Sequence, residues 1–249
     1  MECSIIGKKS NGSKCYMLNK IKNELLLLGD SERANKLSSF FKTGKGEYGE
    51  GDVFLGISVP QQRKVAKKYT DLSLDQLEKL LSSKFHEYRL TALIILVLKY
   101  GKADNSGKKE IFDFYLKNTE FINNWDLVDL SSPKIIGDFL INRERSVLFE
   151  LVNSDNLWKR RIAVLATFSF IRNDDFVDAL SISRLLISDV HDLIHKAVGW
   201  MLREIGKRDE NTLRNFLNKY YKQMPRTMLR YSIEKLSEKE RKHYLNKSQ

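Results

Sequence analysis

The chain has 249 residues, of which 42% are hydrophobic and 30% are charged, and its formal net charge is +11. This length allows one large domain or two small ones, and the apolar content is sufficient for a packed core. No stretch approaches the roughly 18 apolar residues of a membrane-spanning helix, and the N-terminus lacks an apolar signal core, so the sequence predicts a cytoplasmic protein. The positive charge favours a polyanionic partner, nucleic acid before an acidic membrane, although a basic protein without an anionic ligand has the same composition.

Helical periodicity begins near the N-terminus. Apolar residues recur at helical spacing from Leu18 to Leu28 and again from Leu74 to Leu81. Helix-start signals such as Ser73-Leu-Asp-Gln are frequent, strand-like alternation is scarce, and the chain has only three prolines. The sequence therefore predicts an all-α protein of about a dozen helices.

The segment from Gly44 to Pro60 interrupts these helices. It contains five of the thirteen glycines, and a helix does not form at that density. Long glycine-rich loops in compact proteins are often functional. This one lacks the GK[ST] ending of a phosphate-binding P-loop and carries acids where phosphates would lie, so we do not expect it to bind a nucleotide, and its role stays open.

Five helical segments then share a repeat period. Their equivalent apolar positions are Ala92, Val128, Ala163, Val198 and Ile233, separated by 36, 35, 35 and 35 residues. Shorter amphipathic stretches lie between them, as expected for repeated helix pairs. The pattern predicts a curved α-solenoid of HEAT-like repeats with an extended concave face.

We expect these segments to form a single domain and the protein to be a monomer. Residues 1–13 would be a loose N-terminus, and residues 14–58 would hold the N-terminal helices and the glycine-rich segment. Residues 59–245 would form the HEAT-like repeats.

Cations recur in register with the repeat. They are Arg89, Lys159, Arg160, Arg161, Lys196, Arg203, Arg226 and Arg230. If equivalent positions face the same way, these side chains form a stripe along the concave face that could follow a phosphate backbone. Solvated helix faces with internal salt bridges are the alternative, and the sequence leaves both interpretations open.

The second repeat departs from this stripe at the sequence FINNWDLVD. Asp126 stands where neighbouring repeats carry cations, and Asp129 follows Trp125 by one turn on the same helical face. Trp200 falls near the equivalent level of its own helix. A carboxylate in a basic groove opposes phosphate binding, so it is either a structural acid paired with Arg161 or it faces a cationic centre on the ligand. Asp126 lies about 100° around the helix from Trp125 and is expected to support the structure.

Several local sequences, in order and at repeat spacing, resemble one family. WDLVD, SPKIIGD, SDNLWKRR and HKAVGWMLRE resemble the bacterial DNA alkylation repair glycosylases of the AlkD type, which are built from HEAT-like repeats. FLGISVP, followed shortly by Arg63, resembles the N-terminal signature of that family. The resemblance covers roughly residues 20 to 235.

The resemblance implies a monofunctional DNA glycosylase of base excision repair. Such an enzyme hydrolyses the N-glycosidic bond of N3- and N7-alkylated purines in double-stranded DNA without flipping the base. Carried over, Asp129 would be the catalytic carboxylate, Trp125 and Trp200 would be aromatic walls against the sugar of the lesion, and Arg161 and Arg203 would contact the backbone. The full set of expected DNA-binding residues is Arg161, Arg203, Lys196, Arg160, Lys159, Arg63 and Arg89.

No cofactor or metal is expected, because an alkylated purine is already cationic and leaves without further activation. His191 and His195 are spaced for a metal, but the sequence offers no third ligand. Relatives often carry a second tryptophan where this chain has Asn124, so the site is expected to differ there. The alternatives are a non-catalytic HEAT-like protein that binds bent or branched DNA, and a solenoid for protein interaction, which would prefer an apolar concave face.

Overall fold

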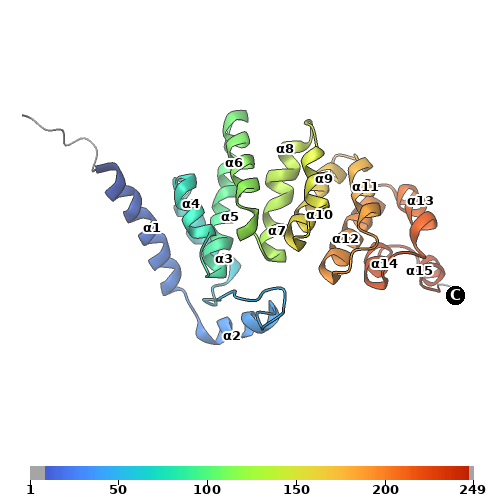
Figure 1. Cartoon of the computed structure of the whole chain (residues 1–249), viewed down its shortest axis with the longest axis horizontal. Coiled ribbons are helices and arrows are strands. Elements are labelled where there is room, and N and C mark those ends of the chain that lie inside the picture. Colours follow the sequence, from blue (N-terminus) through green and yellow to red (C-terminus); the bar gives the residue numbers. More distant parts are fainter. Residues whose placement is uncertain (1–8, 247–249) are drawn as a thin grey trace, which may run out of the picture. The chain divides into compact units, whose positions relative to one another are not determined.

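The computed structural model describes residues 9–246, and their side chains from residue 16 onward. Every regular element in this part is a helix, apart from one isolated bridge between Val53 and Phe85, which confirms the predicted all-α class (Figure 1). No helix in the described part is long and apolar enough to cross a membrane.

The chain forms two compact units, a first unit Met1–Leu127 and a second unit Val128–Gln249. The predicted single domain stays a prediction. Residues 1–8 lie outside the described residues, and helix α1 begins at Lys9, so residues 9–13 are helical where the sequence predicted a loose end.

The first unit is built around α5. Its helices are α1 (Lys9–Leu27), α2 (Ser31–Phe40), α3 (Val59–Lys68), α4 (Leu74–Leu81), α5 (His86–Tyr100), α6 (Asn105–Lys117) and a short 3-10 turn (Thr119–Phe121). α5 packs against α3 and α4 and is buried over most of its length. The predicted start signal at Ser73 is confirmed, because Ser73 and Gln76 form a capping box at α4.

The glycine-rich segment between α2 and α3 is not helical, as predicted. Gly56 has a φ of +82°, and a Cβ there would come within 2.0 Å of the carbonyl oxygen of Asp30. Only glycine fits this close approach of backbone to backbone. The carboxylates of Glu47 and Glu50 accept hydrogen bonds from the backbone N–H groups of Gly44 and Gly46, so the acids of the loop occupy its own amides.

The second unit shows the predicted helix pairs. After the end of α7 (Trp125–Ser132), its helices are α8 (Asp138–Leu140), α9 (Ser146–Val152), α10 (Leu157–Ile171), α11 (Val177–Leu185), α12 (Asp192–Arg208), α13 (Glu210–Tyr220), α14 (Arg226–Ser232) and α15 (Glu238–Leu245). α10 packs against α12 and α12 against α14, and α9, α11 and α13 alternate with them along the chain (Figure 1). The predicted repeat positions Val128, Ala163, Val198 and Ile233 are all buried, which confirms the register.

A π-helical turn, Pro133–Gly137, follows α7 directly. Pro133 has no N–H with which to reach the carbonyl of Asp129 four residues earlier, so the regular α-helical ladder cannot continue. Ser169 on α10 donates a hydrogen bond to the carbonyl of Pro133 at 2.6 Å. A Cβ at Gly137 would lie 2.3 Å from the carbonyl oxygen of Ala166, so α10 passes in backbone contact with this turn. The contacts of this turn with α10 hold the end of α7, just beyond Asp129, against α10.

Candidate active site

Asp129 and Arg161 form a bidentate ion pair within the second unit. Arg161 Nε lies 2.9 Å from Asp129 Oδ1, and Nη2 lies 2.8 Å from Oδ2. The third interaction of the guanidinium is with the carbonyl of Leu193, at 2.6 Å from Nη1. The Arg161 side chain is 6% exposed, whereas that of Asp129 is 20% exposed. Arg161 therefore joins α7, α10 and α12, and the pair is the structural one that the sequence offered as an alternative.

One fifth of the Asp129 side chain stays exposed in this arrangement. Each carboxylate oxygen has two lone-pair sites, and Arg161 uses one site on each oxygen of Asp129. The fork geometry also fixes the plane of the carboxylate. Asp129 can therefore form a structural ion pair with Arg161 and still present a partly exposed carboxylate with a fixed orientation.

Trp200 is held on α12 in the same unit. Its Nε1 donates to Glu204 Oε1 at 3.0 Å, and its ring centroid lies 5.9 Å from that of Phe168. The side chain is half-buried. Its orientation is therefore set both by a hydrogen bond and by a neighbouring ring.

Trp125 belongs to a column of aromatic rings in the first unit. It stacks on Phe41 with centroids 5.1 Å apart and planes 14° apart, and it meets Phe40 edge-on at 6.0 Å. Phe41 stacks in turn on Phe54 at 5.0 Å, and Phe54 stacks on His86 at 4.5 Å. The sequence alone did not predict this column. Its local signal is the pair of adjacent phenylalanines, Phe40 and Phe41, just before the glycine-rich segment.

His86 lies between two carboxylates at the end of this column. Its Nε2 is 2.8 Å from Asp126 Oδ2, and its Nδ1 is 3.1 Å from Asp52 Oδ2. Burial, the largest single influence, would lower the pKa of His86, but the two carboxylates outweigh it and raise the pKa to about 9. Burial likewise opposes the charge of Asp52, but His86 and Arg89 hold its pKa below the usual value. The prediction that Asp126 supports the structure is confirmed.

Arg89 is a correction to the expected set of DNA-binding residues. It is 5% exposed, its Nη2 lies 2.6 Å from Asp52 Oδ1, and its Nη1 donates to the carbonyl of Ser83. A guanidinium buried against a carboxylate cannot reach a phosphate, so Arg89 belongs to the interior of the first unit.

The other expected cations are mostly engaged in ion pairs. Arg160 binds Asp189 at 2.7 Å, Lys196 binds Asp192 at 2.7 Å, and Arg203 pairs with Glu234. Lys159 is half-buried, and Arg63 is exposed on α3. The second interpretation of the stripe, helix faces with internal salt bridges, thus describes much of it.

The two histidines on α12 have structural partners. His191 Nδ1 accepts the N–H of Leu193 and so caps the helix, and His195 Nε2 contacts the carbonyl of Asp189. Among the residues that the structure describes, no group of three or more His, Cys, Asp or Glu side chains is placed to hold a metal ion.

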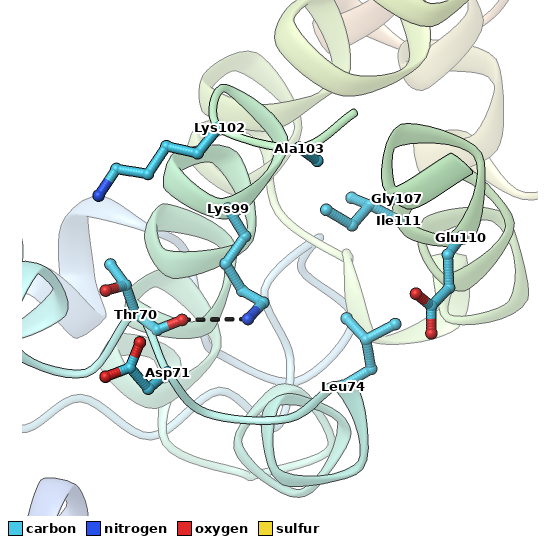
Figure 2. Close-up of a pocket in the computed structure, with 9 residues that line it drawn as sticks. All are labelled: Thr70, Asp71, Leu74, Lys99, Lys102, Ala103, Gly107, Glu110 and Ile111. Atoms are coloured by element: carbon cyan, nitrogen blue, oxygen red, sulfur yellow. Dashed lines mark hydrogen bonds between the residues drawn. The ribbon is translucent and has the colours of Figure 1, made fainter. Parts of the chain in front are cut away.

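One cavity of the first unit, of about 310 Å³, lies between α4, α5 and α6, where Lys99 donates to the carbonyl of Thr70 (Figure 2). None of the expected site residues lines it. Another cavity of this unit, of about 270 Å³, is lined in part by Phe41, Phe54 and Asp126, beside the ring column.

These features define an all-helical repeat protein with an arginine-paired carboxylate, Asp129, on α7 and the candidate site tryptophans Trp125 on α7 and Trp200 on α12. Residues 21–236 match the family model described as DNA alkylation repair enzyme. The chain therefore belongs to the DNA alkylation repair enzyme family, which gives it a role in DNA alkylation repair with DNA as its partner.

Solved structures agree with this assignment at the level of the fold. A predicted DNA alkylation repair enzyme from Enterococcus faecalis superposes with a TM-score of 0.67 at 17% identity, covering 84% of this chain and 97% of that one. AlkD2 from Streptococcus mutans gives 0.54 at 18% identity, covering 89% and 98%. The smu.31 protein from Streptococcus mutans UA159 gives 0.50 at 19% identity, covering 94% and 98%. No curated protein matches the chain.

Proposed function

We propose that the protein is a monofunctional DNA glycosylase that excises N3- and N7-alkylated purines from double-stranded DNA, with Asp129 as the catalytic carboxylate. The observation that carries the proposal is the geometry of Asp129. Buried Arg161 holds both of its oxygens, yet one fifth of the side chain stays exposed. Such an acid is charged, oriented and accessible, as an electrostatic catalyst must be.

The chemistry needs only this one acid. The alkylated purine already carries a positive charge, so the bond from its nitrogen to C1′ can break with the electron pair moving to the base, which leaves neutral. The sugar gains oxocarbenium character, which the Asp129 carboxylate stabilises. Water then attacks C1′ and gives up a proton that the carboxylate can accept. The products are the free alkylpurine and an abasic site.

The tryptophans would stabilise the same positive charge. The ring faces of Trp125 and Trp200 are suited to contact the cationic lesion and its sugar, with about 1–2 kcal/mol from each cation–π contact when water is excluded. Because the base leaves from within the duplex in this proposal, no deep pocket for a flipped base is required.

Arg161 takes a different role from the one that the resemblance implied. Its guanidinium already donates hydrogen bonds to Asp129 and to the carbonyl of Leu193, so we propose that it orients the acid and does not contact the DNA backbone. The phosphates would be contacted by Arg63, Lys159, Lys196 and Arg203, the last two by exchanging their present carboxylate partners for phosphate.

The test is incubation with N-methylated duplex DNA, followed by chromatography of the released bases. We expect 7-methylguanine and 3-methyladenine above the spontaneous rate, and we expect Asp129→Asn to lose most excision while it keeps DNA affinity. Asp178→Asn is the matched control, because Asp178 is also paired with an arginine, Arg145, and its side chain is 16% exposed. Absence of released base from the wild type would refute the proposal.

A non-catalytic protein for bent or branched DNA is the second candidate. It is favoured by Asn124, which stands where relatives often place a second ring and is instead buried, with its amide donating to Asp52 at 3.3 Å. In that case Asp129 is neutral or inhibitory for DNA binding, so Asp129→Asn leaves duplex affinity unchanged or raises it. Either function predicts salt-dependent duplex binding, with a log–log slope of about −0.9 per phosphate contacted.

A further inference from the structure

Residues 41–54 pack behind Trp125. Phe41, at the end of α2, lies flat against the indole, and Phe54, at the other end of the segment, lies flat against Phe41. Phe41 is 6% exposed, whereas Trp125 is half-buried. One side of the tryptophan thus rests on a ring that is itself enclosed.

The segment is fastened to the start of α5 by its backbone. Val53 donates to the carbonyl of Lys84 at 3.1 Å, and the N–H of His86 donates to the carbonyl of Val53 at 2.9 Å. Just beyond the segment, the buried carboxylate of Glu87 accepts three backbone N–H groups, those of Leu55, Gly56 and Ile57, at 2.9, 2.8 and 3.2 Å. Such a carboxylate fixes a loop firmly, because breaking these bonds would leave a charge buried without partners.

The same segment is also fastened to the first turn of α7. Asp52 accepts the Asn124 amide at 3.3 Å and contacts His86, and the opposite nitrogen of His86 contacts Asp126. Asn124 Oδ1 accepts the N–H of Trp125 at 2.8 Å. Both neighbours of Trp125 in the chain are therefore tied to Asp52, one directly and one through His86.

We propose that residues 41–54 are a positioning element that sets the ring plane of Trp125. Phe41 supplies the backing ring, and Asp52, acting through His86 and Asn124, holds the helix turn that carries the indole. These residues touch neither substrate nor reacting atoms. Their effect on excision rests on the proposed glycosylase function, and their effect on Trp125 does not. A displacement of about 1 Å in a positioned group can cost on the order of 100-fold in rate, so such support would be selected in an enzyme.

The direct test is the solvent access of Trp125 by acrylamide quenching of its fluorescence. The full chain with Trp158→Phe and Trp200→Phe leaves Trp125 as the single indole. We expect Phe41→Leu to raise the quenching constant about twofold, because a branched aliphatic chain cannot replace a stacked ring, and Phe41→Tyr to leave it unchanged. Phe112→Leu is the matched control, because Phe112 is buried to a similar degree, 8% exposed, on α6. Equal quenching in Phe41→Leu and in the parent would overturn the proposal.

Asp52→Asn allows the same quenching measurement without removing a ring. If Phe41→Leu does not fold, this variant decides whether residues 41–54 position Trp125. It keeps the shape of Asp52 but not the charge that holds His86, so the quenching constant should rise here too. Asp113→Asn, which removes a surface acid paired with Lys109, should match the parent. An Asp52→Asn protein with the same quenching as the parent contradicts the proposed role of Asp52.

Excision supplies the second readout. With otherwise wild-type tryptophans, Phe41→Leu should lower the single-turnover rate of 7-methylguanine release about tenfold at unchanged duplex affinity, and Phe41→Tyr should restore it. Rates equal to wild type in Phe41→Leu contradict the catalytic part. If the wild type releases no base, the glycosylase proposal fails, whereas the quenching result still decides whether residues 41–54 position Trp125.

Discussion

The Asp129–Arg161 pair gives the sharpest prediction for the second unit. Arg161→Met removes a guanidinium that makes two hydrogen bonds to Asp129 and one to the carbonyl of Leu193. It leaves a partly buried carboxylate and a carbonyl without their donor. Asp129→Leu creates the reverse problem, since it leaves a buried guanidinium without its anion.

The magnitude follows from the burial of the two side chains. Breaking a buried ion pair costs about 3–5 kcal/mol, and because one fifth of the Asp129 side chain reaches water we expect the lower end, about 3 kcal/mol, for each single variant. The double variant removes both charges and replaces them with apolar groups. It should lose clearly less than the sum of the single losses, with a coupling energy of about 2 kcal/mol.

Urea unfolding measures this cycle if the signal comes from the second unit alone. With Trp125→Phe in the background, the remaining tryptophans are Trp158 and Trp200, both in that unit. The free energy of unfolding is obtained from the emission by linear extrapolation. Strict additivity of the two substitutions would show that the two side chains are not paired in the folded protein, and would remove the basis for assigning Arg161 to the orientation of Asp129.

Three further predictions concern the first unit and the DNA contact. Burial alone would lower the pKa of His86, but the neighbouring carboxylates raise it to about 9. The stability that its charge contributes is therefore complete below the ordinary pKa of 6.5 and is lost as the pH rises through 9. In urea titrations, the wild type should lose up to about 3 kcal/mol of unfolding free energy relative to His86→Gln between about pH 6 and about pH 10. Arg63→Ala should reduce the log–log salt slope of duplex binding by about 0.9, measured by fluorescence anisotropy, and an unchanged slope would exclude Arg63 as a phosphate contact. Gly56→Ala should lower the free energy of unfolding, measured in urea from Trp125 emission, by more than about 2 kcal/mol, because φ is +82° and the new Cβ would lie 2.0 Å from the carbonyl oxygen of Asp30. Gly101→Ala should not lower it in this way, because its Cβ would meet nothing closer than 3.6 Å.

The helices were predictable because their signal is local and periodic. A repeat that stacks on its neighbours must bury the same position in each copy, and the spacing of about 35 residues marks those positions without any knowledge of the partner helix. Val128, Ala163, Val198 and Ile233 are buried for this reason. The start of α4 was predictable too, since a capping box is formed by residues three apart.

The partners of the charged residues were not predictable in this way. Repeat spacing gives the positions of Arg89 and Arg160, but it does not show that Asp52 lies against the first or Asp189 against the second. Asp52 meets His86 across 34 residues, from a segment without periodicity, so no pattern connects them. The same limit hid the ring column, in which Phe41 and Trp125 lie 84 residues apart in the sequence (125 − 41).

The ion pair also explains how an acid can work in a protein with a net charge of +11 that binds a polyanion. Near phosphates, a free cation is drawn to the backbone. The Arg161 guanidinium is instead enclosed and bound to Asp129 and to the carbonyl of Leu193. In the proposed enzyme, Arg161 orients the carboxylate while the exposed part of Asp129 faces the sugar. The cation bound to the proposed catalytic acid would then be one that does not contact DNA, and the pairing of Arg161, not its charge alone, determines its role.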